Sequence, residues 1–123
     1  MKIDVVIENP PYNEFTGKGT QSKPLYNIFV ENAVTMSRDI VSMIIPSKYF
    51  GGGIGLNSFR DYMRLNRNLK KYVHYIDAKE CFQGVEIAGG VGYFIIDKKY
   101  TEKCEFTSIV QGEEHSKIVD LSN

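Results

Sequence analysis

Apolar residues occur in short runs that end at prolines or polar residues, and the first run is the most informative. Val5 to Ile7 is β-branched throughout, as in strands that are buried on both faces of a parallel sheet. We therefore interpret this run as a buried strand. It ends at Asn9, because Pro10 and Pro11 lack the N–H that a strand ladder requires. In open α/β sheets ligands bind beyond the carboxyl ends of strands, so Asn9 and Tyr12 lie where chemistry is expected.

Apolar residues that recur every three or four positions predict two helices. The first covers residues 25–36, and the second covers residues 56–66, with Asn57 or Ser58 as its N-cap. Residues 13–23 are polar and contain glycine, which indicates a loop between the first strand and the first helix.

Four further segments have the composition of strands: 40–45, 71–77, 90–96 and 104–110. Strands and helices alternate in the first part of the chain, which favours a mostly parallel sheet with helices on its faces. The last strands follow one another without a helix, so at least one runs antiparallel near the end. The residues after them are polar and are expected to fray. The predicted fold class is α/β, with residues 1–123 as a single domain.

Basic and acidic residues number fifteen each, so the formal net charge is zero and the chain as a whole lacks the signature of a nucleic-acid-binding protein. Local charge is uneven, and one segment is basic: Arg60, Arg64, Arg67, Lys70 and Lys71. Such a segment is usually a solvated helix face, and alternatively it contacts an anionic partner. Lys48, in the loop after the second strand, is a further candidate for contact with a phosphate.

The sequence indicates neither a membrane protein nor a secreted one. No apolar run approaches the roughly 20 residues that span a bilayer, and no basic-then-apolar leader is found. Cys81 and Cys104 match neither a disulfide framework nor a zinc site, so we expect reduced thiols in a cytoplasmic protein without a bound metal. His74 and His115 are interpreted as packed or exposed side chains rather than catalytic ones.

The turn Asn9-Pro10-Pro11-Tyr12 has the groups needed to hold an amine on a flat base. The side-chain oxygen of Asn9 can accept one amine hydrogen, and the carbonyl of Pro10 can accept the other. These two hydrogen bonds increase the electron density on the nitrogen, and the ring of Tyr12 offers a face on which the base can stack. The alternative is a strand-ending turn in which Asn9 only caps the backbone.

This turn, placed after an apolar strand, resembles the catalytic motif of the amino-directed DNA methyltransferases, above all those that produce N6-methyladenine. The resemblance to the bifunctional restriction–modification adenine methyltransferases continues in the family's order along nearly the whole chain, to about Phe106. The matching segments are 26–31, 44–50, 53–56, 59–62, 81–85 and 89–94.

The resemblance implies a Rossmann-like methyltransferase sheet, S-adenosylmethionine as methyl donor, and an adenine flipped out of double-stranded DNA. Asn9, Pro10 and Tyr12 would be the catalytic residues, and Tyr12 and Phe82 would bind the flipped adenine from its two sides. With DNA as the partner, the candidates for contacts to its backbone are Lys48, Arg60 and Arg64.

The chain departs from the family's pattern in two ways. Glu8 precedes the catalytic turn, where the family often has a small or apolar residue. The chain also corresponds to the catalytic domain from its fourth strand onward, so it lacks the amino-terminal half that holds S-adenosylmethionine. Residues 51–55 are glycine-rich, but no acidic residue follows at the spacing of a nucleotide site.

We therefore expect part of a site-specific adenine methyltransferase that is inactive alone. The first strand would then have an unpaired apolar edge, so we expect self-association, or pairing with the missing amino-terminal half, at Val5 to Ile7. The alternative is a non-catalytic DNA-binding or assembly module derived from a methyltransferase. An unrelated nucleotide-binding α/β protein would need a phosphate loop that the sequence does not contain.

Overall fold

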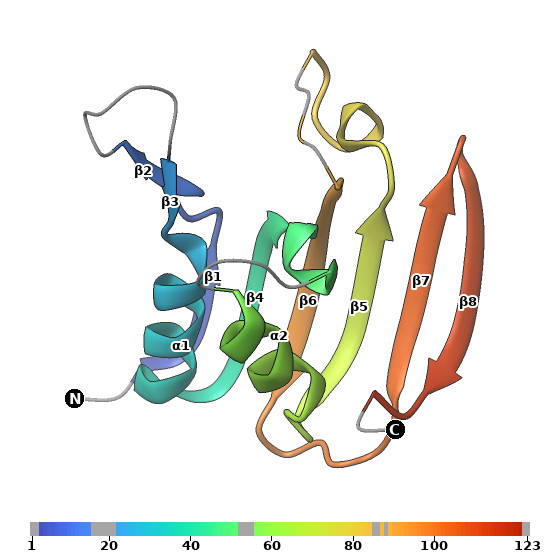
Figure 1. Ribbon diagram of the computed structural model, residues 1–123. Helices are drawn as coiled ribbons and strands as arrows, with labels where there is room; N and C mark the ends of the chain where they lie inside the picture. Colours follow the sequence, from blue (N-terminus) through green and yellow to red (C-terminus); the bar gives the residue numbers. More distant parts are fainter. Residues whose placement is uncertain (1–2, 16–21, 52–55, 85–86, 88, 122–123) are drawn as a thin grey trace.

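The computed structural model describes residues 3–15, 22–51, 56–84, 87 and 89–121, and a six-stranded sheet is its centre (Figure 1). The strands in spatial order are β1 (Ile3–Glu8), β4 (Ser37–Pro46), β6 (Val91–Asp97), β5 (Leu69–Tyr75), β7 (Cys104–Val110) and β8 (Glu113–Val119). Two short strands, β2 (Asn13–Phe15) and β3 (Ser22–Pro24), form a separate antiparallel pair within the segment predicted as a loop.

The sheet is mixed. β1 pairs with β4 and β5 pairs with β7 in parallel, whereas β6 is antiparallel to both β4 and β5, and β8 is antiparallel to β7. The prediction of an antiparallel strand near the end is confirmed, and the prediction of a mostly parallel sheet is matched only in part. The reason is that β6 returns directly from β5 without a crossover helix, and such a return gives an antiparallel neighbour.

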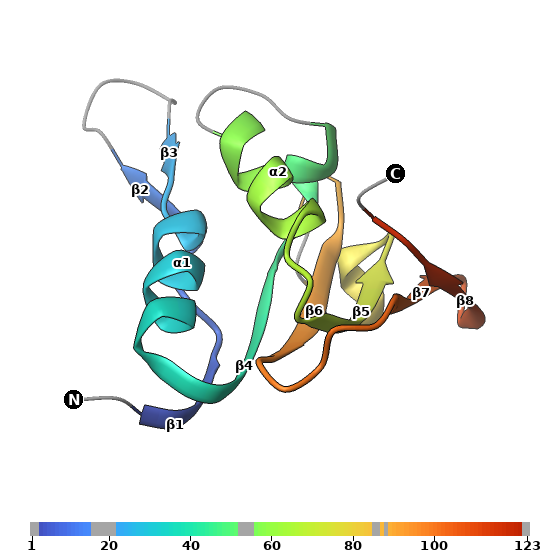
Figure 2. The same cartoon turned by 90° about the horizontal axis from the view of Figure 1, so that it is seen from below.

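Both α-helices lie on one face of the sheet (Figure 2). They are α1 (Tyr26–Met36) and α2 (Asn57–Arg64), and two short 3-10 helices accompany them, η1 (Lys48–Gly51) and η2 (Ala78–Glu80). Among the side chains between the helices and the sheet, Val30, Phe59, Ile45, Phe94 and Ile96 are almost completely buried. In the described part of the chain the opposite face carries no helix, so the prediction of helices on both faces is met on one.

The helices are held by packing rather than by caps. Neither has a side-chain hydrogen bond at its N-cap, and the N-cap of α2 is Leu56. The prediction of Asn57 or Ser58 as the cap is therefore wrong. Burial of Phe59 stabilises α2 by roughly 1.5–3 kcal/mol, which exceeds the roughly 1 kcal/mol that a cap contributes.

The prediction that the first strand is buried on both faces is wrong. β1 lies at the edge of the sheet, where Val5 is 44% exposed and Ile7 is 78% exposed. Val6 alone of this run packs against the core. An apolar run indicates that a strand can be buried, but its neighbours determine whether it is.

The segment predicted to fray forms β8. Gln111 and Gly112 both have positive φ angles, 50° and 78°, which make a tight turn between β7 and β8. Such turns suit the right-handed twist of a hairpin. The hydroxyls of Thr107 and Ser116 lie 2.7 Å apart across the pair. The Gln-Gly pair was the signal for this hairpin.

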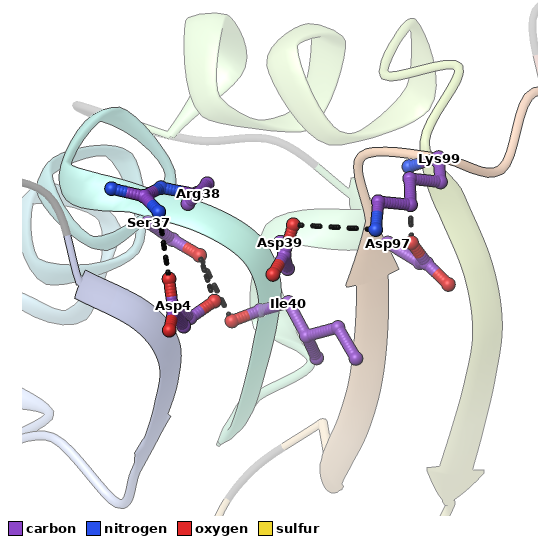
Figure 3. Close-up of polar contacts among 7 residues, drawn as sticks. All are labelled: Asp4, Ser37, Arg38, Asp39, Ile40, Asp97 and Lys99. Atoms are coloured by element: carbon purple, nitrogen blue, oxygen red, sulfur yellow. Dashed lines mark hydrogen bonds and ion pairs between the residues drawn. The ribbon is translucent and has the colours of Figure 1, made fainter.

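Polar contacts fix the amino end of β4 (Figure 3). Ser37 is fully buried, and its Oγ lies 3.0 Å from the carbonyl oxygen of Ile40 and 3.4 Å from that of Asp4. The hydroxyl therefore satisfies backbone groups where the register between β1 and β4 shifts. Ion pairs in the same region join Arg38 with Asp4 at 3.6 Å and Lys99 with Asp39 at 3.9 Å.

Candidate functional site

Three segments that the sequence resemblance singled out lie at one end of the sheet. β1, β4 and β5 run in the same direction, so their carboxyl ends lie at the same edge (Figure 1). The turn 9–12 follows β1, the segment from Ser47 into η1 follows β4, and the loop 76–90 joins β5 to β6. Ligands bind at this edge in open α/β sheets.

The turn after β1 combines an anchored proline with an accessible amide. Pro10 is buried, whereas Asn9 and Pro11 are exposed. The carbonyl of Tyr12 accepts a hydrogen bond from the N–H of Leu25 at 2.9 Å, which ties the turn to the start of α1. The side chain of Asn9 is therefore presented to solvent from a rigid support, as an acceptor for an external amine requires.

The ring of Tyr12 is half-buried and packs against a second aromatic ring, that of Tyr26. It meets the ring of Tyr26 edge-on, with centroids 6.4 Å apart and an interplanar angle of 81°. Tyr26 in turn packs edge-on against Phe59 of α2 at 5.8 Å. Sequence reasoning did not identify Tyr26 as a supporting residue, because its only signal was an aromatic residue at the start of the helix after the turn.

The Tyr12 hydroxyl faces inward. It is buried without a hydrogen-bond partner in the described part of the chain. Burial raises the pKa of Tyr12, and the nearby Cys81 thiol raises it further. Cys81, which precedes Phe82 in the sequence, is thus near enough to the Tyr12 hydroxyl to influence its pKa. That Tyr12 and Phe82 enclose a base stays a prediction.

Phe82 lies in the loop that follows η2. Its N–H donates to the carbonyl of Ala78 at 2.8 Å, and its side chain is partly exposed. Asp77 caps η2, since its carboxylate accepts the Lys79 N–H at 3.0 Å. The beginning of the loop is therefore ordered, with Phe82 at the end of the sheet where Tyr12 lies.

The three cations predicted to contact DNA lie in different places. Lys48 is exposed at the carboxyl end of the sheet, next to the loops just described. Arg60 and Arg64 are on α2 and pair with Asp61 at 3.9 Å and 3.5 Å. Arg64 also lines an open pocket near Leu69 and Cys104, which begin β5 and β7 at the opposite end of the sheet. Their contacts with DNA remain predictions, and the location favours Lys48.

Of the glycine-rich segment 51–55, the structure describes Gly51, and its surroundings are open. Gly51, the described part of the glycine-rich segment, lies in η1, and an added Cβ there would meet no atom within 4 Å. No atom of the described chain packs against this position, so internal packing gives no reason for a glycine there. In the described part of the chain no group of three or more His, Cys, Asp or Glu side chains could hold a metal ion, and no helix is long and apolar enough to cross a membrane.

The hydroxyl of Tyr26 gives a direct test of the aromatic packing between Tyr12, Tyr26 and Phe59. It is buried without a hydrogen-bond partner among the described residues, and burial raises the pKa of Tyr26 to about 12. We expect Tyr26→Phe to raise the free energy of unfolding by about 1 kcal/mol, because it removes an unpaired polar group. The control is Tyr49→Phe, which removes a donor to Tyr72 at 2.8 Å and should lower that free energy by about 1 kcal/mol. Urea unfolding measures both, and an equal loss in the two variants would contradict the interpretation.

Comparisons with known proteins show what the chain is similar to. The family model described as Eco57I restriction-modification methylase matches residues 1–82. A protein of Mycoplasma pneumoniae described as an uncharacterized adenine-specific methylase is 37% identical over 108 residues, which are 84% of this chain. The chain spans only 25% of the length of that relative.

Solved structures share the fold. The type IIG restriction endonuclease BpuSI matches 86% of this chain and 15% of its own, with a TM-score of 0.62 and 21% identity. A modification subunit of a putative type I restriction enzyme from Vibrio vulnificus matches 91% of this chain and 27% of its own, with a TM-score of 0.63 and 15% identity. In each case the chain corresponds to a small part of a larger protein.

Proposed function

Because the chain belongs to the Eco57I restriction-modification methylase family, we propose that it supplies the catalytic turn and base pocket of a site-specific DNA methyltransferase acting on adenine N6. The proposal is supported by the turn after β1, in which a buried Pro10 presents an exposed Asn9 beside the half-buried ring of Tyr12. The name of the Mycoplasma pneumoniae relative, an adenine-specific methylase, supports adenine as the target base.

In this proposal the chain binds and orients the base. Asn9 Oδ1 and the Pro10 carbonyl accept the two hydrogens of the exocyclic amine, which directs its lone pair away from the ring. Tyr12 stacks on one face of the base and Phe82 closes the other. The edge-on contact between Tyr12 and Tyr26 agrees with this role, because it orients the Tyr12 ring while its hydroxyl points inward.

We propose that S-adenosylmethionine is the methyl donor and that it is held by a part of the enzyme outside these residues. The chain is then the carboxyl-terminal part of a catalytic domain in a restriction–modification enzyme of the cytoplasm, with double-stranded DNA as partner. The function test uses tritiated S-adenosylmethionine and DNA. We expect no transfer by the 123-residue chain alone and labelled N6-methyladenine from an enzyme that joins it to a donor-binding half. Robust turnover by the isolated chain would contradict the proposal that another part of the enzyme binds the methyl donor. Labelled cytosine would contradict the choice of adenine as the target base.

The edge of β1 is the proposed contact with that missing half. Ile3, Val5 and Ile7 are all more than 40% exposed, and an edge strand offers unpaired backbone groups to another strand. The same apolar character continues onto the open face, where Ile7, Ile40 and Ile95 line a shallow groove. Without the donor-binding half, two copies of the chain are expected to pair through β1.

Lysine substitution tests this contact. We expect Val5→Lys to convert self-associated chain into monomer in sedimentation equilibrium, because a charged residue blocks edge pairing. The control is Ile118→Lys, since Ile118 is 65% exposed on the opposite edge strand β8. A wild-type chain that is strictly monomeric without an added partner would rule out the proposed pairing.

A second candidate is a non-catalytic DNA-binding or assembly module, favoured by the exposed apolar edge of β1, which offers a surface to a partner chain. Calorimetry distinguishes the two candidates. Binding of neither DNA nor donor, together with tight binding of a protein partner, would favour assembly. Binding of adenine-containing DNA that depends on Asn9 would favour the methyltransferase.

A further inference from the structure

Phe50 of η1 is an exposed aromatic residue whose ring is held in place by other rings. It is 39% exposed, yet its ring centroid lies 5.0 Å from that of His74, 5.5 Å from that of Tyr72 and 6.2 Å from that of Phe106. Its backbone is also fixed, because its N–H donates to the carbonyl of Ser47 at 3.0 Å. An exposed ring that its neighbours hold in one orientation loses little entropy when a flat ligand packs against it.

His74 and Phe106 extend this surface along the sheet. Phe106 of β7 is the register partner of Tyr72 of β5, and their rings stack at 5.5 Å with an interplanar angle of 9°. The ring of His74 is held by Ser47, whose Oγ lies 2.8 Å from Nδ1. Tyr72 and His74 are two residues apart in one strand, so they project to the same face of the sheet. We call Phe50, His74 and Phe106 the aromatic platform.

A cation borders the aromatic platform. Lys117 of β8 is exposed and is the register partner of Phe106. Residues that lie opposite each other in paired strands project to the same face, so Lys117 stands beside the platform. Further along this face of β8, the carboxylate of Glu113 lies 3.8 Å from the His115 ring. Lys48, in the same short helix as Phe50, is exposed as well, so the charge next to the platform is mainly positive.

No helix in the described part of the chain covers the platform from the side of β7 and β8, which extend beyond α2 (Figure 2). η1 follows β4 at the carboxyl end of the sheet, where the turn after β1 also lies. Tyr49, the residue before Phe50, contacts Tyr26 with ring centroids 6.4 Å apart, and Tyr26 contacts Tyr12. The platform is therefore connected to the proposed base pocket through two successive ring contacts.

We propose that the aromatic platform binds a second, unpaired nucleobase of the DNA, which stacks on Phe50 while Lys117 contacts its phosphate. The inference deepens the proposed function and rests on it, because DNA is the ligand there. Stacking on an aromatic ring suits any base, and a neighbouring cation suits the phosphate that each nucleotide carries. An apolar peptide side chain would need no cation beside the rings. Extrusion of one base from a duplex also unpairs its partner, so the substrate of the proposed reaction supplies a base of this kind.

Titration of the 123-residue chain with a single-stranded oligothymidylate of about eight nucleotides tests the proposal. The chain is labelled with ¹³C in its phenylalanine rings, and no methyl donor is present. We expect the ring resonances of Phe50 and Phe106 to shift and to show contacts with thymine protons. The probe contains no adenine, so the result does not depend on the proposed target base or on methyl transfer. The proposed function and this inference can therefore fail separately.

Substitution of Phe50 tests the stacking. Phe50→Leu keeps an apolar side chain but removes the π-face, so oligothymidylate should bind about tenfold more weakly, as expected for the loss of one stacked base. Phe50→Tyr keeps the ring and should bind as wild type. The control is Tyr100→Leu, which removes a partly exposed ring between β6 and β7, at the opposite end of the sheet. Its affinity should stay within about twofold of wild type.

Substitution of Lys117 tests the phosphate contact. Lys117→Gln should reduce the dependence of log K on log salt by about 0.7, the value for one phosphate of a single strand. Lys103→Gln, which removes an exposed lysine next to the start of β7, should leave that dependence unchanged. Equal affinities of wild type, Phe50→Leu and Phe50→Tyr would overturn the proposal. Oligothymidylate that shifts no platform resonance would also overturn it and would favour a protein segment as the occupant of this surface.

Discussion

Gly90→Ala is expected to lower the free energy of unfolding by more than about 3 kcal/mol, a loss that follows from geometry alone. An added Cβ would lie 2.2 Å from the carbonyl oxygen of Tyr75 and 2.8 Å from that of Ile76. Both are backbone atoms at the end of β5, so neither can move without disturbing the sheet. The φ angle of Gly90 is +80°, which adds the strain of a left-handed conformation for any other residue.

Gly84→Ala is the matched control. Gly84 has a φ angle of +77°, but an added Cβ there would meet no atom within 4 Å. Its replacement should therefore cost only the conformational strain, about 1 kcal/mol. Urea unfolding of the two variants separates strain from close approach, and equal losses would show that the contact between Gly90 and β5 does not exist in solution.

Asn9→Ala is expected to reduce methyl transfer by about 100- to 1000-fold in the enzyme that joins this chain to a donor-binding half. Preorganised hydrogen bonds at a reacting atom are typically worth this much, because they act where charge develops in the transition state. Asn9 is exposed, so its truncation should leave the free energy of unfolding within about 0.5 kcal/mol of wild type. A large loss of activity with unchanged stability is the signature of a catalytic residue.

Asn32→Ala provides the comparison, since Asn32 is an exposed asparagine on α1 and has no role in the proposed site. Single-turnover transfer to DNA should be the same in this variant as in wild type. An Asn9→Ala enzyme that retains transfer within about threefold of wild type would remove Asn9 from the catalytic residues and favour its interpretation as a turn residue.

The local patterns predicted most elements, because they record which residues face the core. β7 begins and ends at the predicted residues, Cys104 and Val110, and α1 differs from its predicted range by one residue at its start. Strand order was not predictable in the same way. The position of β6 between β4 and β5 depends on pairing between distant segments, and the composition of residues 90–96 gives no information about neighbours.

The residues of the candidate site also fall into two groups, those predictable from local sequence and those that depend on long-range packing. A contiguous motif is the basis for predicting Asn9, Pro10 and Tyr12, and a second motif is the basis for predicting Phe82; these roles stay predictions. The contact between Tyr12 and Tyr26 was not predictable, because the fold brings the two rings together from separate segments, as it does the side chains of Ser47 and His74. In the sequence, Tyr26 and His74 are chemically ordinary, and only the structure shows which side chains they contact.

Because β6 is antiparallel to β5, the loop that carries Phe82 can change in length without moving the strands of the sheet. Because β5 and β6 are hydrogen-bonded neighbours, the loop leaves and re-enters the sheet at adjacent positions, and its ends stay together whatever its length. Gly84, near its middle, has open space around it. An insertion in a crossover connection to a distant strand would displace elements of the sheet, whereas an insertion in this loop would leave the strands in place. We therefore expect the length and sequence of this loop to vary among related chains while the turn after β1 stays unchanged.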